Sequence, residues 1–245
     1  MLIINMTNDL EMPISAHIEE LRQRLIFVLL AFIVITGISL FNVKTIVQVL
    51  QLPAQGIKFL QLAPGEYFFA SFKVAVFTGL LLSTPFLMVQ LLLFVLPGLN
   101  QTERTVFIIL TISSTVLFFT GLLFGYFILI PAALGFFIKY GSNIVEPLWS
   151  FEQYFNFILL LLISNGLAFE IPIIQILLSF FNLISGEQML SIWRYVIVFS
   201  TILGAVLTPS TDPFTQLLLS IAILSLYLLG LMIIFSFRKY FPKFF

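Results

Sequence analysis

The chain has 245 residues, of which 60% are hydrophobic and only 9% are charged. A soluble domain of this size could not keep so much apolar surface away from water, so the composition indicates an integral membrane protein. Acidic and basic residues balance at 11 each, which leaves no basic excess of the kind that nucleic-acid binding requires, and we expect no nucleic-acid partner. Cysteine is absent and His17 is the single histidine, so cysteine chemistry and histidine metal clusters are excluded. We expect no metal and no other cofactor.

Residues 14–24 predict an amphipathic helix that lies along the inner membrane surface. Its apolar residues recur four, three and four positions apart on one helical face, at Ile14, Ile18, Leu21 and Leu25. Glu20 stands four residues before Arg24, which is the favourable order for an ion pair on a helix. A solvated face with one weak ion pair is therefore a sufficient explanation of these charges.

Six apolar segments follow, and we expect all six to be transmembrane helices because the alternation typical of a β-barrel is absent. They cover residues 25–43, 67–96, 105–138, 153–183, 195–207 and 214–237. The second, third and fourth reach about 45 Å or more at 1.5 Å per residue, which exceeds a hydrocarbon core of about 30 Å. Each contains a proline that bends a helix, at Pro85, Pro131 and Pro172. We predict a single transmembrane domain over residues 1–245, an all-α fold of six kinked helices that form a concave bundle.

The fifth segment, 195–207, is only about 20 Å long as a helix, and the sixth follows almost at once. Three arrangements remain open: the membrane thins locally, the polar turn sits below the membrane surface, or the hairpin is re-entrant. Asp212 lies in this outer turn. It either hydrogen-bonds backbone donors of the turn or contacts a partner.

Basic residues predict the orientation. With six crossings, one side holds Arg22, Arg24, Arg104, Arg194, Arg238, Lys239 and Lys243, and the other holds Lys44, Lys58 and Lys139. This distribution predicts that both termini lie inside.

Lys73, near one end of the second helix, is expected to reach outward toward the interface, in a packing or anchoring role or in a functional one. The excess of residues with AT-rich codons favours a plastid thylakoid membrane, with a bacterial inner membrane as the alternative.

Glu170 is an acid inside an otherwise uncharged membrane segment. Such a residue costs roughly 2.5 to 3.5 kcal/mol if it has no partner, so it should face another protein group, a wet cavity or a substrate. A proton- or ion-coupled secondary transporter is one interpretation, but the two halves of the chain share no visible repeat of the kind that transporters show. An enzyme is a weaker interpretation, because no motif places a nucleophile beside a base, and we expect no catalytic residue.

Glu103 lies in the inner loop between the second and third segments. Asn100 or Thr102 could cap the third helix, with Glu103 in its first turn, where the helix dipole favours negative charge. Helix capping alone would therefore account for this acid.

The segment from His17 to Leu25 closely resembles the N-terminal signature of the TatC family, the multispanning component of the twin-arginine protein translocase. Further segments resemble the same family in the same order along nearly the whole chain: 64–68 with Lys73, 83–85 with Gln90 and 94–99, 102–104, 169–172 and 207–212. Several motifs in register with six apolar segments make the resemblance specific.

This resemblance implies a receptor for the twin-arginine signal peptides of folded precursor proteins, within a larger oligomeric translocase in the lipid bilayer. Glu20 and Glu103 match the carboxylates that receive the two signal arginines, and a carboxylate suits the planar guanidinium fork. Glu170 matches the intramembrane acid that contacts single-span subunits of the TatA and TatB type. Gln90 is a further polar group of this region, and Asp212 belongs to the outer turn.

Overall fold

The computed structural model describes residues 14–141, 148–207 and 213–240, and these are almost entirely helical. The longer helices are α1 (Ile14–Phe41), α3 (Glu66–Val95), α4 (Gln101–Phe124), α5 (Ile130–Gly141), α6 (Phe151–Ala168), α7 (Ile171–Phe180), α9 (Trp193–Leu207) and α10 (Pro213–Tyr240). The shorter elements are α2 (Val43–Gln51), α8 (Gly186–Ser191), the 3₁₀ turns η1 (Leu52–Ala54) and η2 (Leu96–Gly98), the π-helical turn η3 (Gly125–Leu129) and the strands β1 (Lys58–Leu60) and β2 (Leu148–Ser150). The predicted all-α architecture is confirmed, with a small parallel pair of strands that the sequence did not indicate.

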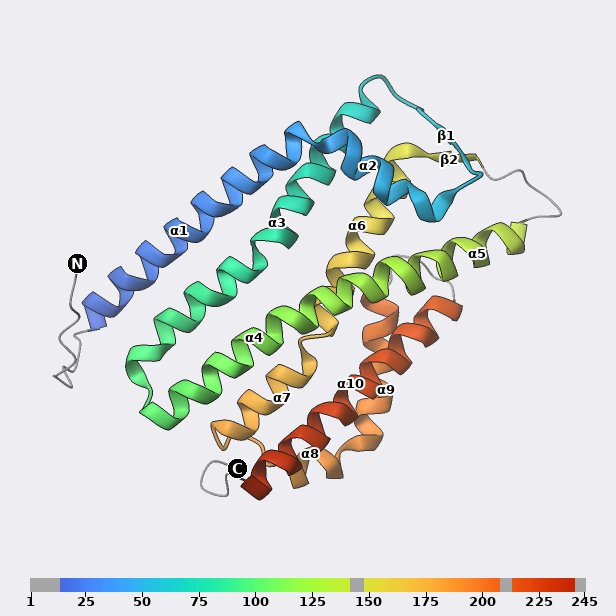
Figure 1. Cartoon of the computed structure of the whole chain (residues 1–245). Coiled ribbons are helices and arrows are strands. Elements are labelled where there is room, and N and C mark those ends of the chain that lie inside the picture. The colour runs from blue at the N-terminus through green and yellow to red at the C-terminus, as the bar shows by residue number, and fades with distance from the viewer. Residues whose placement is uncertain (1–13, 142–147, 208–212, 241–245) are drawn as a thin grey trace.

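The long helices run back and forth between two ends of the molecule (Figure 1). We call the end that holds η2 the α3–α4 end, and the opposite end, which holds β1 and β2, the β-strand end. The first turns of α1 and the last turns of α7 and α10 lie toward the α3–α4 end (Figure 1). Two stretches are continuous series of elements, α4–η3–α5 and α6–α7.

Five helical stretches of the described residues are long and apolar enough to cross a membrane: 17–41, 66–98, 103–140, 151–180 and 213–236. Each overlaps one of the predicted segments, although the first begins eight residues before the predicted 25–43. Helix α9 covers the predicted fifth segment but has only 15 residues, or about 22 Å of helix. The number of crossings therefore stays a prediction at this one hairpin.

The predicted surface helix of residues 14–24 is wrong as a separate element. Helix α1 runs without a break from Ile14 to Phe41, so this segment is the first part of the first apolar helix. No glycine or proline lies between Ile14 and Thr36, and residues such as Leu, Arg, Glu and Gln favour continued helix. The apolar spacing that suggested a separate helix does not mark a covered face here, because Ile18 and Leu25 are exposed, and such spacing carries no information about a bend.

The three prolines in the long segments have different consequences. Helix α3 continues through Pro85. Pro131 is the second residue of α5, just after the π-helical turn η3, which accommodates the lost bond to the carbonyl four residues earlier. Pro172 coincides with a full break: α6 ends at Ala168, the residue whose carbonyl Pro172 cannot satisfy, and α7 begins at Ile171.

Helices α4 and α6 approach each other closely through glycines. A Cβ on Gly121 would lie 2.8 Å from the carbonyl oxygen of Asn165, and one on Gly166 would lie 2.6 Å from the Phe118 ring. Gly125 similarly faces the Asn165 side chain. Small residues of this kind let membrane helices pack backbone to backbone, where no hydrophobic effect drives them together.

Two apolar cores stabilise the two ends. The core of the β-strand end is centred on α6, whose Phe155, Ile158 and Leu161 are almost completely buried against α2, α3 and η3. The core of the α3–α4 end joins α4, α7 and α10 and includes Phe107 and Phe180, whose rings meet edge to face at 5.6 Å. The helix series α6–α7 belongs to both cores, so it is the central element of the fold.

We expect Gly121→Ala to destabilise the protein, because the added methyl meets backbone of α6 that cannot move without separating the helices. Overpacking of this kind typically costs about 1–3 kcal/mol. The matched control is Gly135→Ala in α5, where a Cβ meets nothing within 4 Å and the better helix propensity of alanine should be neutral or helpful. Thermal unfolding of the detergent-solubilised variants measures both, and equal unfolding temperatures would contradict close α4–α6 packing.

Candidate functional site

One aromatic contact brings the candidate receptor carboxylates to the same end of the molecule. The His17 ring in the first turns of α1 stacks on the Phe94 ring in the last turn of α3, with centroids 4.2 Å apart and an interplanar angle of 21°. Glu20 lies one turn beyond His17, and Glu103 lies in the first turn of α4, just after the chain leaves α3 through η2. The two predicted carboxylates therefore share the α3–α4 end (Figure 1).

Glu20 is held by its own helix. Its Oε1 accepts hydrogen bonds from both Nε and Nη2 of Arg24, the former at 3.1 Å, and its Oε2 lies 4.0 Å from Nδ1 of His17. The Glu20 and Arg24 side chains are 24% and 21% exposed, whereas the neighbouring Arg22 and Glu19 pair is 69% and 61% exposed. The predicted ion pair between Glu20 and Arg24 is confirmed, and it is more sheltered than a typical surface pair.

Glu103 caps the helix on which it lies. Asn100 is the N-cap residue of α4, and the Glu103 Oε2 accepts the Asn100 backbone N–H at 2.9 Å, which completes a capping box. Of the two capping residues that the sequence offered, Asn100 is therefore the correct one. The other oxygen, Oε1, has only a long 3.5 Å contact with the Asn100 side-chain amide. The cap fixes the Glu103 carboxylate at the edge of the α3–α4 end formed by the first turns of α1 and α4, which we call the rim. It leaves most of the bonding capacity of Oε1 available.

Glu170 lies at the break between α6 and α7, buried to 9% exposure. Its Oε2 accepts a hydrogen bond from the Ser114 hydroxyl of α4 at 2.7 Å. Its Oε1 is buried and has no hydrogen-bond partner among the residues that the structure describes. Ser114 is thus the protein group that this acid was expected to face, and it satisfies one carboxylate oxygen. The second oxygen, Oε1, could still accept a hydrogen bond from a further donor.

A shallow groove of about 210 Å³ opens next to this acid, between α3, α4 and α7. Its lining is apolar except for two hydroxyl residues of α4, Thr111 and Ser114. Ser114 therefore touches both the groove and Glu170. Gln90 is half-buried on α3 and is not among the groove-lining residues.

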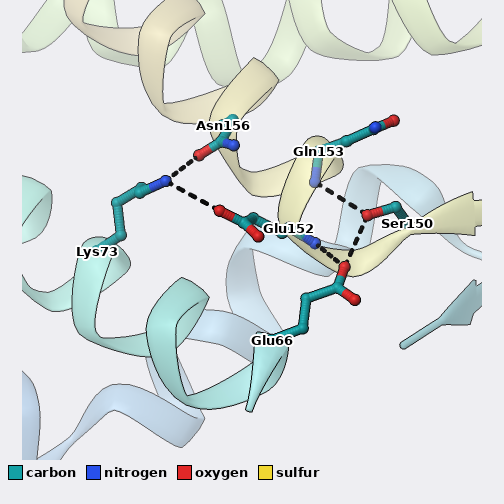
Figure 2. A network of polar contacts seen from close by, with 6 residues as sticks. All are labelled: Glu66, Lys73, Ser150, Glu152, Gln153 and Asn156. Carbon is teal, nitrogen blue, oxygen red and sulfur yellow. Dashed lines mark hydrogen bonds and ion pairs between the residues drawn. The ribbon is translucent and has the colours of Figure 1, made fainter. Parts of the chain in front are cut away.

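The β-strand end holds a polar network that sequence reasoning missed (Figure 2). Glu66, the first residue of α3, accepts hydrogen bonds at Oε1 from the Ser150 hydroxyl at 2.7 Å and from the Glu152 backbone N–H at 2.9 Å. Its Oε2 accepts the backbone N–H groups of Leu62 and Ala63. Because three of these four partners are N–H donors, the side chain fits as an ionised carboxylate, which only accepts hydrogen bonds.

Lys73 extends the same network. Its ammonium donates to Oδ1 of Asn156 at 2.6 Å and to Oε1 of Glu152 at 3.4 Å, so it links α3 to the first turns of α6 (Figure 2). Lys73 thus joins α3 to α6, which agrees with the packing or anchoring role that was one of its two predicted roles. Glu66 gave no such signal, because its partners Ser150 and Glu152 lie 84 and 86 residues away in the chain. The fifth predicted site residue, Asp212, lies outside the described residues.

Comparisons with known proteins identify the family. The family model described as Sec-independent protein translocase protein (TatC) matches residues 16–221. This chain is 58% identical over 232 residues to a TatC-like protein of Porphyra purpurea, with 95% of this chain and 91% of that protein covered. It is 52% identical over 224 residues to the Sec-independent protein translocase protein TatC of Synechocystis, with 91% and 88% covered. The chain belongs to the TatC family.

A more distant relative and a solved structure agree with this membership. The Sec-independent protein translocase protein TATC, chloroplastic, of Arabidopsis thaliana is 48% identical over 226 residues, with 91% of this chain and 66% of that protein covered. A crystal structure of the twin arginine translocase receptor TatC superposes with a TM-score of 0.78 at 33% identity and covers 89% of this chain and 99% of that one. Both the sequence and the fold of TatC thus extend over nearly all of this chain.

Membership of the TatC family confirms the resemblance found in the motifs. The protein is a membrane component of the Tat protein translocase, which acts with other Tat subunits, and it is not an enzyme. The alternative of an ion-coupled transporter built on Glu170 is not favoured by any of these relatives.

At the β-strand end of this TatC protein, we expect Glu66→Ala to lower the unfolding temperature by several degrees. The substitution removes the acceptor of four hydrogen bonds and leaves donors from two chain segments unsatisfied. The control is Lys73→Met, which removes contacts between side chains that are 37% and 42% exposed and should cost much less. Thermal unfolding in detergent compares them. A larger loss for Lys73→Met would mean that the ion pair, and not the Glu66 carboxylate, stabilises this end.

Proposed function

We propose that this protein is the receptor for twin-arginine signal peptides and the core subunit of a translocase that moves folded proteins across a membrane. One observation supports this proposal above the others: two partly exposed carboxylates, Glu20 and Glu103, occupy the same end of the fold on two different helices. Two acids at one rim match two adjacent guanidinium groups, each of which binds a carboxylate through a planar fork.

The helix-capping role of Glu103 is compatible with this proposal. The capping box uses Oε2 and holds the side chain in one conformation, so little rotamer entropy is lost when an arginine binds at Oε1. Capping thereby preorganises the acid for a ligand that approaches from the rim.

The α3–α4 end is proposed to face the side of the membrane from which precursor proteins arrive. If α9 and α10 complete six crossings, both termini lie inside with Glu20 and Glu103, where precursor proteins arrive. A local thinning of the bilayer accommodates the 15 residues of α9, and the long bent helices form a concave bundle. The chloroplast relative supports a thylakoid membrane, and the Synechocystis relative keeps the bacterial inner membrane as the alternative.

Glu170 is the proposed contact for the single-span subunits of the TatA and TatB type. A helix that packs in the groove between α3, α4 and α7 contacts Ser114, whose hydroxyl bonds Glu170, so it can act on this acid through Ser114. The apolar lining of the groove suits the side chains of a membrane helix. Gln90 on α3 and Asp212 in the outer turn are secondary candidates for contacts within the oligomeric complex.

We expect Glu103→Ala and Glu20→Ala each to weaken binding of a twin-arginine precursor, and the double variant to lose most of it. Truncating one partner of a charge-assisted pair typically costs about 1.5 to 3 kcal/mol, or roughly ten- to a hundredfold in affinity. Glu19→Ala is the matched control, because it removes a neighbouring carboxylate that is 61% exposed and pairs with Arg22. Titration of a fluorescent signal peptide against the purified protein measures the effect. Full binding by a correctly inserted double variant would refute the receptor assignment.

We expect Glu170→Ala to impair assembly with the single-span subunits while signal-peptide affinity stays unchanged, because Glu170 bonds Ser114, which lies about 16 Å along α4 from Glu103. Glu170→Gln should be milder, since an amide keeps the hydrogen bond with Ser114 and carries no charge to desolvate. Co-purification of the subunits and transport into membrane vesicles are the measurements.

A photo-crosslinker at groove-lining Thr111 should capture a subunit, and one at exposed Leu160 should capture lipid. Equal capture at both positions would contradict the groove as the contact.

A further inference from the structure

The proposed receptor carboxylate of α1 is already occupied by an arginine of the same chain. The Arg24 guanidinium directs both Nε and Nη2 to Oε1 of Glu20, and His17 stands 4.0 Å from Oε2. The side chains of Glu20 and Arg24 are only about a quarter exposed. The ion pair therefore sits in a partly sheltered position, where the attraction is less screened than at the open surface.

The carboxylate at the other receptor position has no such competitor. Among the described residues no ion pair involves Glu103, whose Oε2 bonds the Asn100 backbone and whose Oε1 has only a weak amide contact. A signal arginine can thus add to Glu103 directly. At Glu20 it must replace a guanidinium of identical chemistry, because a two-point fork needs the oxygen that Arg24 holds.

We propose that Arg24 is a built-in competitor for the signal peptide, which sets the affinity threshold of the receptor at Glu20. This inference rests on the proposed receptor function and adds a regulatory residue to that site. Arg24 does not touch the bound peptide. It acts by withdrawing Glu20 from any ligand that cannot displace an intramolecular arginine.

Competition makes a defined prediction about discrimination. A competitor that must leave before either ligand binds lowers the affinities of an arginine peptide and a lysine peptide by the same factor. Arg24 therefore leaves the ratio of the two affinities unchanged. Arg24 weakens the binding of both peptides. The lysine peptide, which lacks the guanidinium fork and binds more weakly from the start, is therefore the first whose affinity becomes too low for recognition.

The test uses the full-length protein in lipid nanodiscs and two fluorescent peptides, one with a twin-arginine motif and one with both arginines replaced by lysine. We expect Arg24→Gln to tighten both peptides by the same factor, about two- to fivefold, which corresponds to the usual strength of such an ion pair. Arg24→Lys keeps the charge but loses the fork, and it should tighten binding by a smaller factor. Both Arg24 variants are compared with the parent by thermal unfolding.

Arg22→Gln is the matched control, because it removes one positive charge from the same turn of α1 while leaving Glu20 and Arg24 paired. It reports the general gain in affinity from lower net positive charge, and Arg24→Gln must exceed it. The double variant Glu20→Gln with Arg24→Gln should bind no more tightly than Glu20→Gln alone, because a competitor has no effect once its site is gone.

The outcomes separate this inference from the receptor assignment. If Glu20→Gln weakens binding but Arg24→Gln binds no tighter than Arg22→Gln, the competitor role is overturned and the receptor stands. Tightening of the arginine peptide alone would also overturn it. If Glu20→Gln and Glu103→Gln both bind the peptide like the parent protein, the receptor assignment itself fails.

Discussion

The close crossing of α4 and α6 is the contact on which the polar middle of this protein depends. Gly121 brings the α4 backbone against the carbonyl of Asn165, and Ser114 lies two turns earlier on the same face of α4. The Ser114 hydroxyl reaches Glu170 only at this helix separation. Because the bilayer offers no water to replace a lost bond, glycine packing and the solvation of the intramembrane acid are one structural requirement.

The two ends of the bundle are built for different tasks. At the β-strand end, Glu66 and Tyr154 tie segments far apart in the chain to one another, the latter through its hydroxyl bond to the Leu50 carbonyl at 2.8 Å. At the α3–α4 end, the hydrogen bonds and ion pairs of Glu20 and Glu103 within the described part of the chain are local, with partners three or four residues away. Local contacts are broken without unfolding anything else, so the rim can exchange partners while the opposite end keeps the helices in place.

The carboxylates of the rim are prepared for ligands in opposite ways. The Asn100 backbone N–H bonds Oε2 of Glu103 and holds the side chain in one orientation. Arg24 neutralises Glu20 and must be exchanged. In the receptor that we propose, an arginine bound at Glu103 holds the second arginine close to Glu20, where it competes with Arg24 at a high effective concentration.

The sequence by itself determined the membrane class, the approximate positions of the apolar helices apart from the start of α1, and the pairing of Glu20 with Arg24, and it narrowed the cap of α4 to Asn100 or Thr102. These features depend on composition or on spacing within one helix, and both can be read directly from the amino-acid sequence. Its motifs also identified the family. Only the tertiary structure decided that α1 is unbroken, that Ser114 faces Glu170 from 56 residues away, and that Glu66 joins the starts of α3 and α6. Those contacts depend on which helix faces meet, and in a chain apolar on nearly every face no periodicity specifies that choice.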